Sequence, residues 1–217
     1  MTRAGRQAVP GRARVAAIVL AAGAGRRMRG ADKLLEAVEG EPVLRRVVRA
    51  ALASRVDETV VVLPPGAEAR RAAVAGLGGE VVEAPDWAEG MAASLRAGLA
   101  AVAARVDAVV VLLADMPEVG PQAIDRLLAA FDPAAGREIV RAVSAEGVPG
   151  HPVLFGRRFF ESLAGLAGDR GAREVIRDAG ALVTDVATGG RGAVVDLDTP
   201  EEWAAWRAAR GAGGQRR

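Results

Sequence analysis

The residues that could do chemistry in this chain of 217 residues lie in a few short segments, the first of which is rich in glycine. Gly23 and Gly25 stand in this segment, and Lys33, the only lysine among 29 basic residues, closes it. Glycines let the backbone turn sharply and bring N–H groups against an anion. A compact ammonium suits a phosphate in a tight loop better than a planar guanidinium does. The segment therefore indicates phosphate binding, and a solvated surface lysine is the alternative.

Two common phosphate-binding loops do not fit this segment. A P-loop requires Gly-Lys followed by Ser or Thr, whereas Lys33 follows Asp32 and precedes Leu34. A dinucleotide-binding fingerprint requires a third glycine where the chain has Met28. What remains is an extended loop that wraps a triphosphate, with Arg27 and Lys33 supplying positive charge from its two ends.

A carboxylate, Asp115, directly follows the apolar run 108–114, which is typical of a buried strand. Ligands in open α/β sheets bind beyond the carboxyl ends of the strands, so Asp115 is expected to meet one. Mg²⁺ is usually held by one or two carboxylates together with phosphate oxygens. Asp115 is therefore predicted to be a metal ligand, and capping of the turn before Pro117 is the alternative.

A second acidic pair, Asp196 and Asp198, stands two residues apart near the end of the chain. In an extended segment both side chains point to the same side, so either could complete the metal site. The following Thr199 and Glu202 have the spacing of a helix capping box. Both interpretations can hold together because the box does not use the Asp198 side chain.

Two further polar side chains are candidates for ligand contact. Ser94 lies one turn inside a predicted helix, where its hydroxyl could face a backbone carbonyl or a ligand. His151 is the only histidine, and it stands in a loop between Gly150 and Pro152. A lone histidine is more often structural than catalytic, and no serine and aspartate accompany it as a triad.

The elements that must position these residues follow from the hydrophobic pattern. Continuous apolar runs, typical of buried parallel strands, alternate with alanine-rich helical patterns. The predicted strands are 15–20, 59–63, 81–83, 108–114, 139–143, 152–155 and 182–186; the predicted helices are 42–53, 67–75, 91–103, 122–131, 172–178 and one that starts at residue 200. This alternation predicts a single three-layer α/β/α sandwich with a mostly parallel sheet and right-handed crossovers.

Five segments of the chain, in order, resemble the nucleotidyltransferases of the molybdenum-cofactor type, and in particular the molybdenum cofactor cytidylyltransferase family. They read LAAGAGRRMRGADK, GMAASL, LADMP, GHPVLF and DLDTP. Ala22 stands at the motif position where the cytidylyltransferases also have alanine and the guanylyltransferases usually have glycine. The chain departs from the pattern at Arg29, where glycine is usual, and at 84–86, which lacks a common asparagine.

The resemblance implies a Rossmann-like nucleotidyltransferase fold and a Mg²⁺-dependent reaction. It implies transfer of CMP from CTP to the phosphate of the molybdenum cofactor, with release of pyrophosphate and with a molybdenum hydroxylase as a recipient of the product. The residues it implicates are Leu20, Ala21, Ala22, Gly23, Gly25, Lys33 and Ser94 for the nucleotide, Lys33, Arg27 and Asp115 for catalysis, Asp115 and Asp198 for the metal, and His151 and Arg173 for the acceptor. A transferase acting on a sugar or polyol phosphate, and a redox or binding protein on the same scaffold, remain as alternatives.

Composition narrows the class of protein further. The chain is 51% hydrophobic and 26% charged, which excludes bulk disorder, and it has no cysteine for disulfides or thiolate metal sites. Four Phe and three Trp are too few for a base-stacking surface, so no nucleic acid is expected, and no apolar run is long enough to span a membrane. The arginine-rich start followed by 15–24 imitates a signal peptide, but the same run begins the first strand, so a cytoplasmic location is expected. We expect one domain, 15–210, between flexible basic tails at 1–14 and 211–217.

Overall fold

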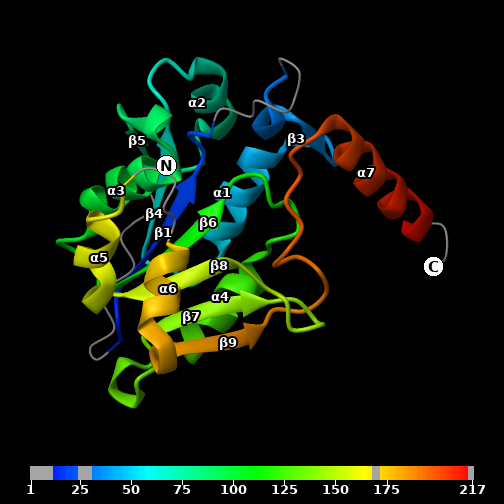
Figure 1. The fold of residues 1–217 in the computed structure, drawn as a ribbon. Coiled ribbons are helices and arrows are strands. Elements are labelled where there is room, and N and C mark those ends of the chain that lie inside the picture. Colours follow the sequence, from blue (N-terminus) through cyan, green and yellow to red (C-terminus); the bar gives the residue numbers. More distant parts are fainter. Residues whose placement is uncertain (1–11, 24–30, 168–171, 215–217) are drawn as a thin grey trace.

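The continuous β-branched runs of the sequence form the centre of a seven-stranded sheet in the computed structural model, which describes residues 12–23, 31–167 and 172–214 (Figure 1). The strand order is β5-β4-β1-β6-β8-β7-β9. The strands are β1 (Val15–Leu20), β4 (Glu58–Leu63), β5 (Glu80–Glu83), β6 (Ala108–Leu113), β7 (Ile139–Val143), β8 (Pro149–Gly156) and β9 (Val183–Ala187). Strand β8 is antiparallel to both of its neighbours, and the other pairings in this sheet are parallel. The predicted mostly parallel sheet is confirmed.

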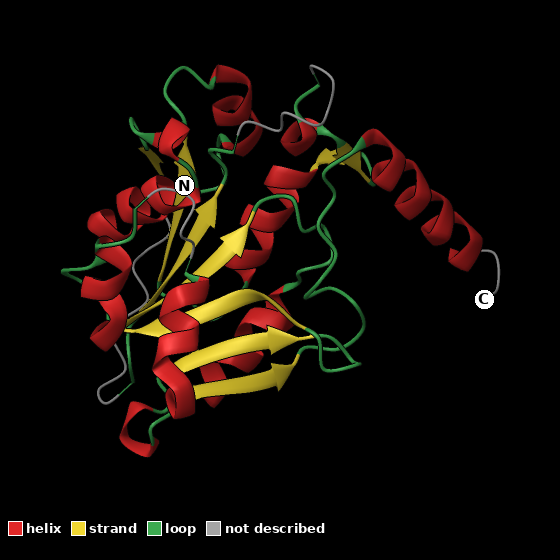
Figure 2. Ribbon diagram, viewed as in Figure 1, coloured by secondary structure: helices red, strands yellow, loops and turns green. Residues whose placement is uncertain are grey.

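Helices cover both faces of the sheet, as predicted for a three-layer sandwich (Figure 2). Helices α1, α2, α4 and α7 contribute to the hydrophobic core on one face, and α3, α5 and α6 to the core on the other. Their bounds are α1 (Val43–Ala53), α2 (Glu68–Val74), α3 (Met91–Val102), α4 (Pro121–Ala130), α5 (Phe160–Ala164), α6 (Arg173–Ala179) and α7 (Pro200–Gly214). No helix among the described residues is long and apolar enough to cross a membrane.

Three short elements differ from the sequence prediction. A two-stranded hairpin, β2 (Ala37–Val38) with β3 (Glu41–Pro42), was not predicted. Its turn residues Glu39 and Gly40 both have positive φ, at 52° and 87°, which is the geometry of a type I′ hairpin turn. The five-residue helix α5 was also missed, because so short a segment shows no helical period. Strand β8 is longer than the predicted 152–155, since it pairs with β6 as far as Gly156 and with β7 back to Pro149.

Helix α3 lies close to the sheet at Gly98. A β-carbon at this position would come within 2.5 Å of Ile18 Cγ2 and 2.8 Å of Val62 Cγ2. Distances this short do not occur in real contacts, so any larger residue would push the helix away from β1 and β4. The absence of a side chain at Gly98 therefore sets how near α3, which carries Ser94, sits to the sheet.

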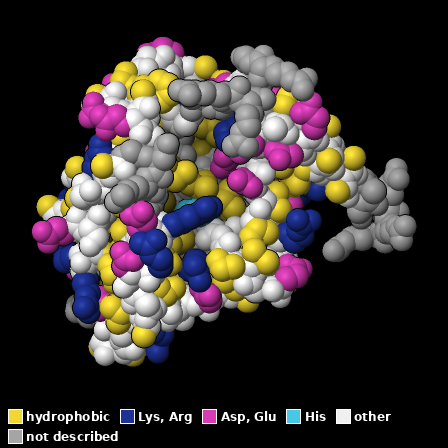
Figure 3. Space-filling model, in the orientation of Figure 1, with side chains coloured by type: hydrophobic (Ala, Val, Ile, Leu, Met, Phe, Trp, Pro, Cys, Tyr) yellow, Lys and Arg dark blue, Asp and Glu magenta, His cyan; other side chains and the backbone are white. Residues whose placement is uncertain are grey.

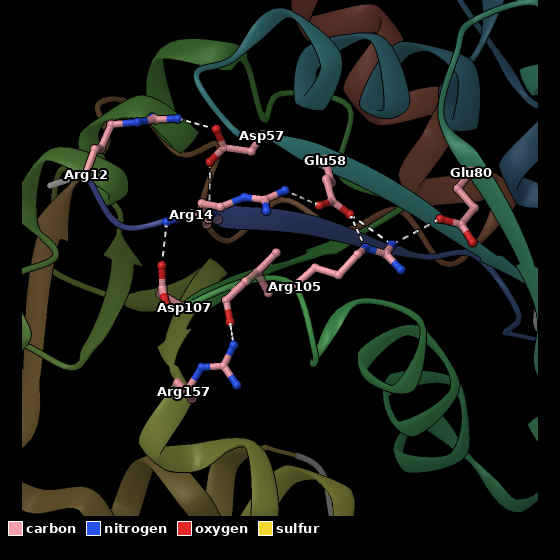
Figure 4. Close-up of polar contacts among 10 residues, drawn as sticks. Arg12, Arg14, Asp57, Glu58, Glu80, Arg105, Asp107 and Arg157 are labelled. Atoms are coloured by element: carbon pink, nitrogen blue, oxygen red, sulfur yellow. Dashed lines mark hydrogen bonds and ion pairs between the residues drawn. The ribbon is translucent and has the colours of Figure 1, made fainter. Parts of the chain in front are cut away.

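The amino ends of the parallel strands are joined by charged side chains (Figure 4). Arg12 pairs with Asp57, and Arg14 donates to Glu58 at 2.8 Å. The backbone N–H of Arg14 also donates to Asp107 Oδ2 at 2.8 Å. The structure therefore places the last residues of the predicted 1–14 tail against the folded body; residues 1–11 lie outside the described residues. At the other end, α7 runs to Gly214, inside the predicted 211–217 tail, of which 215–217 are not described.

Candidate active site

The ammonium of Lys33 joins two carboxylates that are far apart in the sequence. Lys33 Nζ lies 2.5 Å from Asp115 Oδ2 and also donates to Asp198 Oδ1. All three side chains are largely buried. The three residues that the sequence singled out for phosphate and metal binding therefore meet, but in direct contact. The sequence predicts that Lys33 binds phosphate, whereas in the structure it bonds to these two carboxylates.

Strand register and local caps bring these three residues together. In the parallel pair β1–β6, Leu20 is the partner of Leu113, so the glycine-rich segment and Asp115 leave the sheet side by side. Asp32 accepts a hydrogen bond from Leu34 N at 3.0 Å and caps the short helix η2 (Lys33–Leu35), which begins with Lys33.

The segment before α7 is held against Asp115 by its backbone. Leu197 N donates to the carbonyl oxygen of Asp115 at 3.4 Å, which places Asp198 beside it. The predicted capping box is confirmed: Glu202 N donates to Thr199 Oγ1 at 3.2 Å, and Glu202 Oε2 accepts from Thr199 N at 2.9 Å and from Asp198 N at 2.8 Å. The box thus fixes the backbone of Asp198 while leaving its carboxylate to Lys33.

Lys33 and Asp115 lie where two cavities meet. The first, of about 340 Å³, is called here the donor cavity. Among the residues predicted to bind the nucleotide, Leu20, Ala22, Gly23, Lys33 and Ser94 line it, together with the backbone that leads into α3. Ala21 instead packs its side chain into the hydrophobic core. The predicted Gly25 and Arg27 lie outside the described residues.

The second cavity, of about 680 Å³, is called here the acceptor cavity, and Figure 3 shows a hollow near the centre of this face of the molecule. His151 and Arg173, both predicted to bind the acceptor, line it. The two cavities share Leu20, Lys33, Met91, Leu113 and Asp115 in their walls. Asp196 and Asp198 both line the acceptor cavity, but Lys33 bonds to Asp198.

The charge states of two groups follow from their surroundings. Burial lowers the pKa of Lys33, but the charges and hydrogen bonds of Asp115 and Asp198 outweigh it and raise the pKa above its ordinary value. Lys33 is therefore an ammonium at neutral pH. Burial also lowers the pKa of His151; a hydrogen bond with the Val111 backbone and the charges of Asp115 and Asp196 oppose this shift, and Arg173 adds to it. His151 is therefore neutral at neutral pH.

The carboxylates fit a hard divalent cation by one structural test. Asp115 Oδ1 is buried and has no hydrogen-bond partner among the described residues. A buried carboxylate oxygen in this state is a ready ligand. No group of three or more His, Asp or Glu side chains in the described part of the chain could hold a metal ion by itself. A cation at Asp115 and Asp198 would therefore take its remaining ligands from substrate or water, as Mg²⁺ commonly does.

One residue that organises this site was missed by the sequence analysis. Arg70, in α2, is buried and bonds to Ala21, Gly23 and Asp32, on both sides of the glycine-rich segment. With 28 arginines in the chain, nothing in the sequence marks this one.

Known proteins resemble this chain over most of its length. It is 30% identical over 194 residues to nicotine blue oxidoreductase of Paenarthrobacter nicotinovorans, covering 87% of this chain and 94% of that protein. It is 37% identical over 134 residues to a molybdenum cofactor guanylyltransferase of Burkholderia vietnamiensis, covering 61% and 63%. The crystal structure of Rv0371c from Mycobacterium tuberculosis H37Rv superposes with a TM-score of 0.78 at 32% identity, covering 89% and 97%, and a manganese complex of Rv0371c with 0.72 at 31%, covering 88% and 97%.

The similarity extends to the family as a whole. Residues 17–185 match the MobA-like NTP transferase domain, a range that begins in β1 and ends in β9. The match therefore includes the glycine-rich segment, Lys33, Asp115 and His151. The chain belongs to the MobA-like NTP transferase family of nucleotidyltransferases.

Proposed function

We propose that this protein is a magnesium-dependent nucleotidyltransferase that transfers CMP from CTP to the phosphate of the molybdenum cofactor and releases pyrophosphate. The observation that carries the proposal is the meeting of Lys33 and Asp115 at the common wall of two cavities, with Asp198 bonded to Lys33 from the wall of the acceptor cavity. A transferase must hold a donor and an acceptor on either side of the reacting phosphorus. The position of these charges between two cavities supports that arrangement.

The proposed reaction needs no protein nucleophile. An oxygen of the acceptor phosphate attacks the α-phosphorus of CTP, and the bond from this phosphorus to the oxygen that bridges it to the β-phosphate breaks. Pyrophosphate leaves with the electron pair of that bond. Catalysis then consists of positioning the two phosphates in line and neutralising the charge that develops on them.

Lys33 can serve this reaction without leaving its carboxylates. An ammonium has three N–H donors, and Asp115 and Asp198 accept two of them. The third is available to a phosphate oxygen of the leaving pyrophosphate. Asp115 and Asp198 would hold Mg²⁺, which when bound supplies Lewis-acid stabilisation of the transferred phosphate. The manganese complex of Rv0371c, a protein 31% identical to this chain, supports a divalent cation in the proposal.

The choice of CTP rests on two residues in the donor cavity. Ala22 and Ser94 both line it, and both belong to motifs that resemble the cytidylyltransferase branch. The guanylyltransferase of Burkholderia vietnamiensis, 37% identical over 134 residues, makes GTP the nearest competing donor.

The choice of a pterin acceptor rests on the lining of the acceptor cavity. Met91 and Val148, each 50% exposed, are the large hydrophobic side chains that the described residues leave exposed, and both line this cavity. Val111, Val153 and Phe155 lie further in. His151, Arg173 and Asp196 in the same lining offer polar partners to either kind of acceptor, but a planar heterocycle gains more contact with the apolar walls than a sugar or polyol does. This lining favours the molybdenum cofactor over a sugar or polyol phosphate.

The test measures pyrophosphate release with CTP, GTP and ATP in the presence of Mg²⁺, each against the molybdenum cofactor, a sugar phosphate and a polyol phosphate. The proposal expects CTP with the molybdenum cofactor to give the highest kcat/KM. Asp115→Asn should lower kcat at least about 10³-fold, because it removes a carboxylate that contacts the reacting groups. Glu118→Gln, three residues further on, keeps its acceptor for Trp206 Nε1 and serves as the control. Unchanged pyrophosphate release in Asp115→Asn overturns the proposed role.

A second candidate function is an oxidoreductase. The observation that favours it is the 30% identity to nicotine blue oxidoreductase over 87% of the chain. The same preparation is therefore assayed for NAD(P)H consumption with an aromatic dye as electron acceptor. NAD(P)H consumption without any binding or turnover of CTP, GTP or ATP would replace the first proposal with the second.

A further inference from the structure

Arg70 is the one charged side chain that is buried among the described residues. It is 8% exposed, and the other buried polar side chains are serines and a threonine. Burying a guanidinium is unfavourable unless its donors are satisfied by a charge partner and by hydrogen bonds. Arg70 does not line the donor or the acceptor cavity. The reason for burying Arg70 must therefore lie in the groups to which its guanidinium bonds.

The guanidinium of Arg70 makes four hydrogen bonds, and all of them go to the two sides of the glycine-rich segment. Nε donates to Asp32 Oδ2 at 2.6 Å, and Nη2 donates to Asp32 Oδ1 at 3.0 Å. Nη1 donates to the carbonyl oxygens of Ala21 at 2.6 Å and Gly23 at 3.1 Å. One rigid group thus holds Gly23, just after β1, and Asp32, just before Lys33.

Each of these fixed points leads directly to a residue in the donor cavity. Gly23 itself lines the cavity, and Asp32 is followed by Lys33, which it positions by capping η2. Only a planar fork with several donors can satisfy Asp32 and two carbonyl groups at once. A lysine keeps the charge but carries its three donors on one nitrogen, so it cannot reproduce the four hydrogen bonds that the guanidinium makes to both sides of the segment.

We propose that Arg70 is a positioning residue for nucleotide binding: from α2 it sets the separation between Gly23 and Lys33, and so the width of the donor cavity. This inference rests on the proposed function, because it takes the donor cavity to hold a nucleoside triphosphate. Arg70 acts through Asp32 and the carbonyl oxygens, without touching the nucleotide.

The experiment compares Arg70→Lys and Arg70→Met with Arg71→Met. Arg71 is the next residue on the same helix, is exposed and pairs with Glu83 at 2.7 Å, so it is a matched control. The Kd of CTP is measured by calorimetry with Mg²⁺ at a temperature where thermal melting shows each variant to be folded. The KM of CTP, the KM of the acceptor and kcat are measured at the same temperature. Hydrogen exchange of the amides at 34–36 is followed without nucleotide.

The expected result is a Kd and KM for CTP raised at least about 30-fold in both Arg70 variants, with the KM of the acceptor within twofold of the wild type. Exchange at 34–36 should accelerate, because Asp32 loses the group that orients it. Arg71→Met should match the wild type. If Arg70→Lys binds CTP as the wild type does, or if the KM values of CTP and acceptor rise together, Arg70 only stabilises the fold and the inference is overturned. If the wild type binds no nucleotide, the proposed function itself fails.

Discussion

Lys33 Nζ lies 2.5 Å from Asp115 Oδ2, so an ammonium occupies the space beside the carboxylate that the sequence assigns to a metal. The same ammonium bonds to Asp198. Two carboxylates this close would repel each other if nothing neutralised them. Lys33 therefore stabilises the carboxylate pair before any cation binds, and it also opposes the cation electrostatically when one arrives.

Replacing Lys33 by methionine should separate these two effects. Two unit charges about 4 Å apart interact with an energy of roughly 1 kcal/mol in water and roughly 4 kcal/mol near a protein surface. Lys33→Met should therefore tighten the Kd of Mn²⁺ at least about fivefold, while it weakens metal-free binding of CTP at least about tenfold. Calorimetric titrations of each ligand alone measure both constants.

Thermal melting supplies the control for this variant. Lys33→Met should melt at a lower temperature than the wild type without a cation, and Mn²⁺ should raise its Tm by more than it raises that of the wild type. A variant that binds Mn²⁺ more weakly than the wild type would contradict the opposition between the ammonium and the cation.

A substitution at Gly23 tests whether the donor cavity holds the nucleotide. A β-carbon at Gly23 meets no heavy atom within 4 Å, yet Gly23 lines the donor cavity. Gly23→Ala should therefore leave the Tm within about 2 °C of the wild type, since surface changes are usually within about 0.5 kcal/mol. The added methyl takes up space that the nucleotide needs, so the KM of CTP should rise at least about tenfold. An unchanged KM would show that the nucleotide does not approach this backbone.

His151 gives the stability of the fold a pH dependence of known sign. Burial lowers the pKa of His151 below its ordinary 6.5, so around that pH the unfolded chain binds more protons than the folded chain. The neutral ring therefore contributes fully to the free energy of unfolding above about pH 6.5, and this contribution is lost as the pH falls toward the pKa of His151 in the folded state. Compared with His151→Gln, the wild type should lose Tm as pH is lowered from 7.5 to 5.5. A constant Tm difference over this range would mean that folding does not shift the pKa of His151.

Gly98→Ala should destabilise the fold although alanine is the better helix former. The propensity gain is about 1 kcal/mol, while a methyl forced to within 2.5 Å of Ile18 Cγ2 costs about 1–3 kcal/mol or more in a packed core. Thermal melting should show a fall of a few degrees, since about 1 kcal/mol shifts the Tm of a domain this size by roughly 2–4 °C. The penalty should shrink in an Ile18→Ala background, which supplies room for the methyl. A higher Tm for Gly98→Ala alone would mean that α3 can move away without loss.

The fold was largely predictable because its central strands β1, β4 and β6 are almost wholly buried and so appear as nearly unbroken apolar runs. Val15–Leu20 and Ile139–Val143 have the bounds that were predicted. The β2–β3 hairpin was not, because two-residue strands carry no period and its turn relies on Glu39, a residue that seldom adopts positive φ.

The candidate site was predictable only where residue type was unusual. Lys33 stood out as the only lysine, and Asp115 as the carboxylate after a buried run. The contact of Lys33 with Asp198 could not be foreseen, because it depends on Leu197 N bonding to the carbonyl oxygen of Asp115, which is far away in the chain. Arg70 could not be foreseen either, since its role arises from burial and from three backbone and side-chain acceptors that meet only in the folded state.

The common wall formed by Leu20, Lys33, Met91, Leu113 and Asp115 has a thermodynamic consequence. A molecule bound in one cavity contacts side chains that also line the other cavity. We therefore expect binding in the donor cavity and binding in the acceptor cavity to be linked. Linkage is reciprocal: by whatever factor the first substrate changes the affinity for the second, the second changes the affinity for the first. Because the proposed transfer uses no protein nucleophile, both substrates must be bound at the same time, so double-reciprocal plots should show intersecting rather than parallel lines.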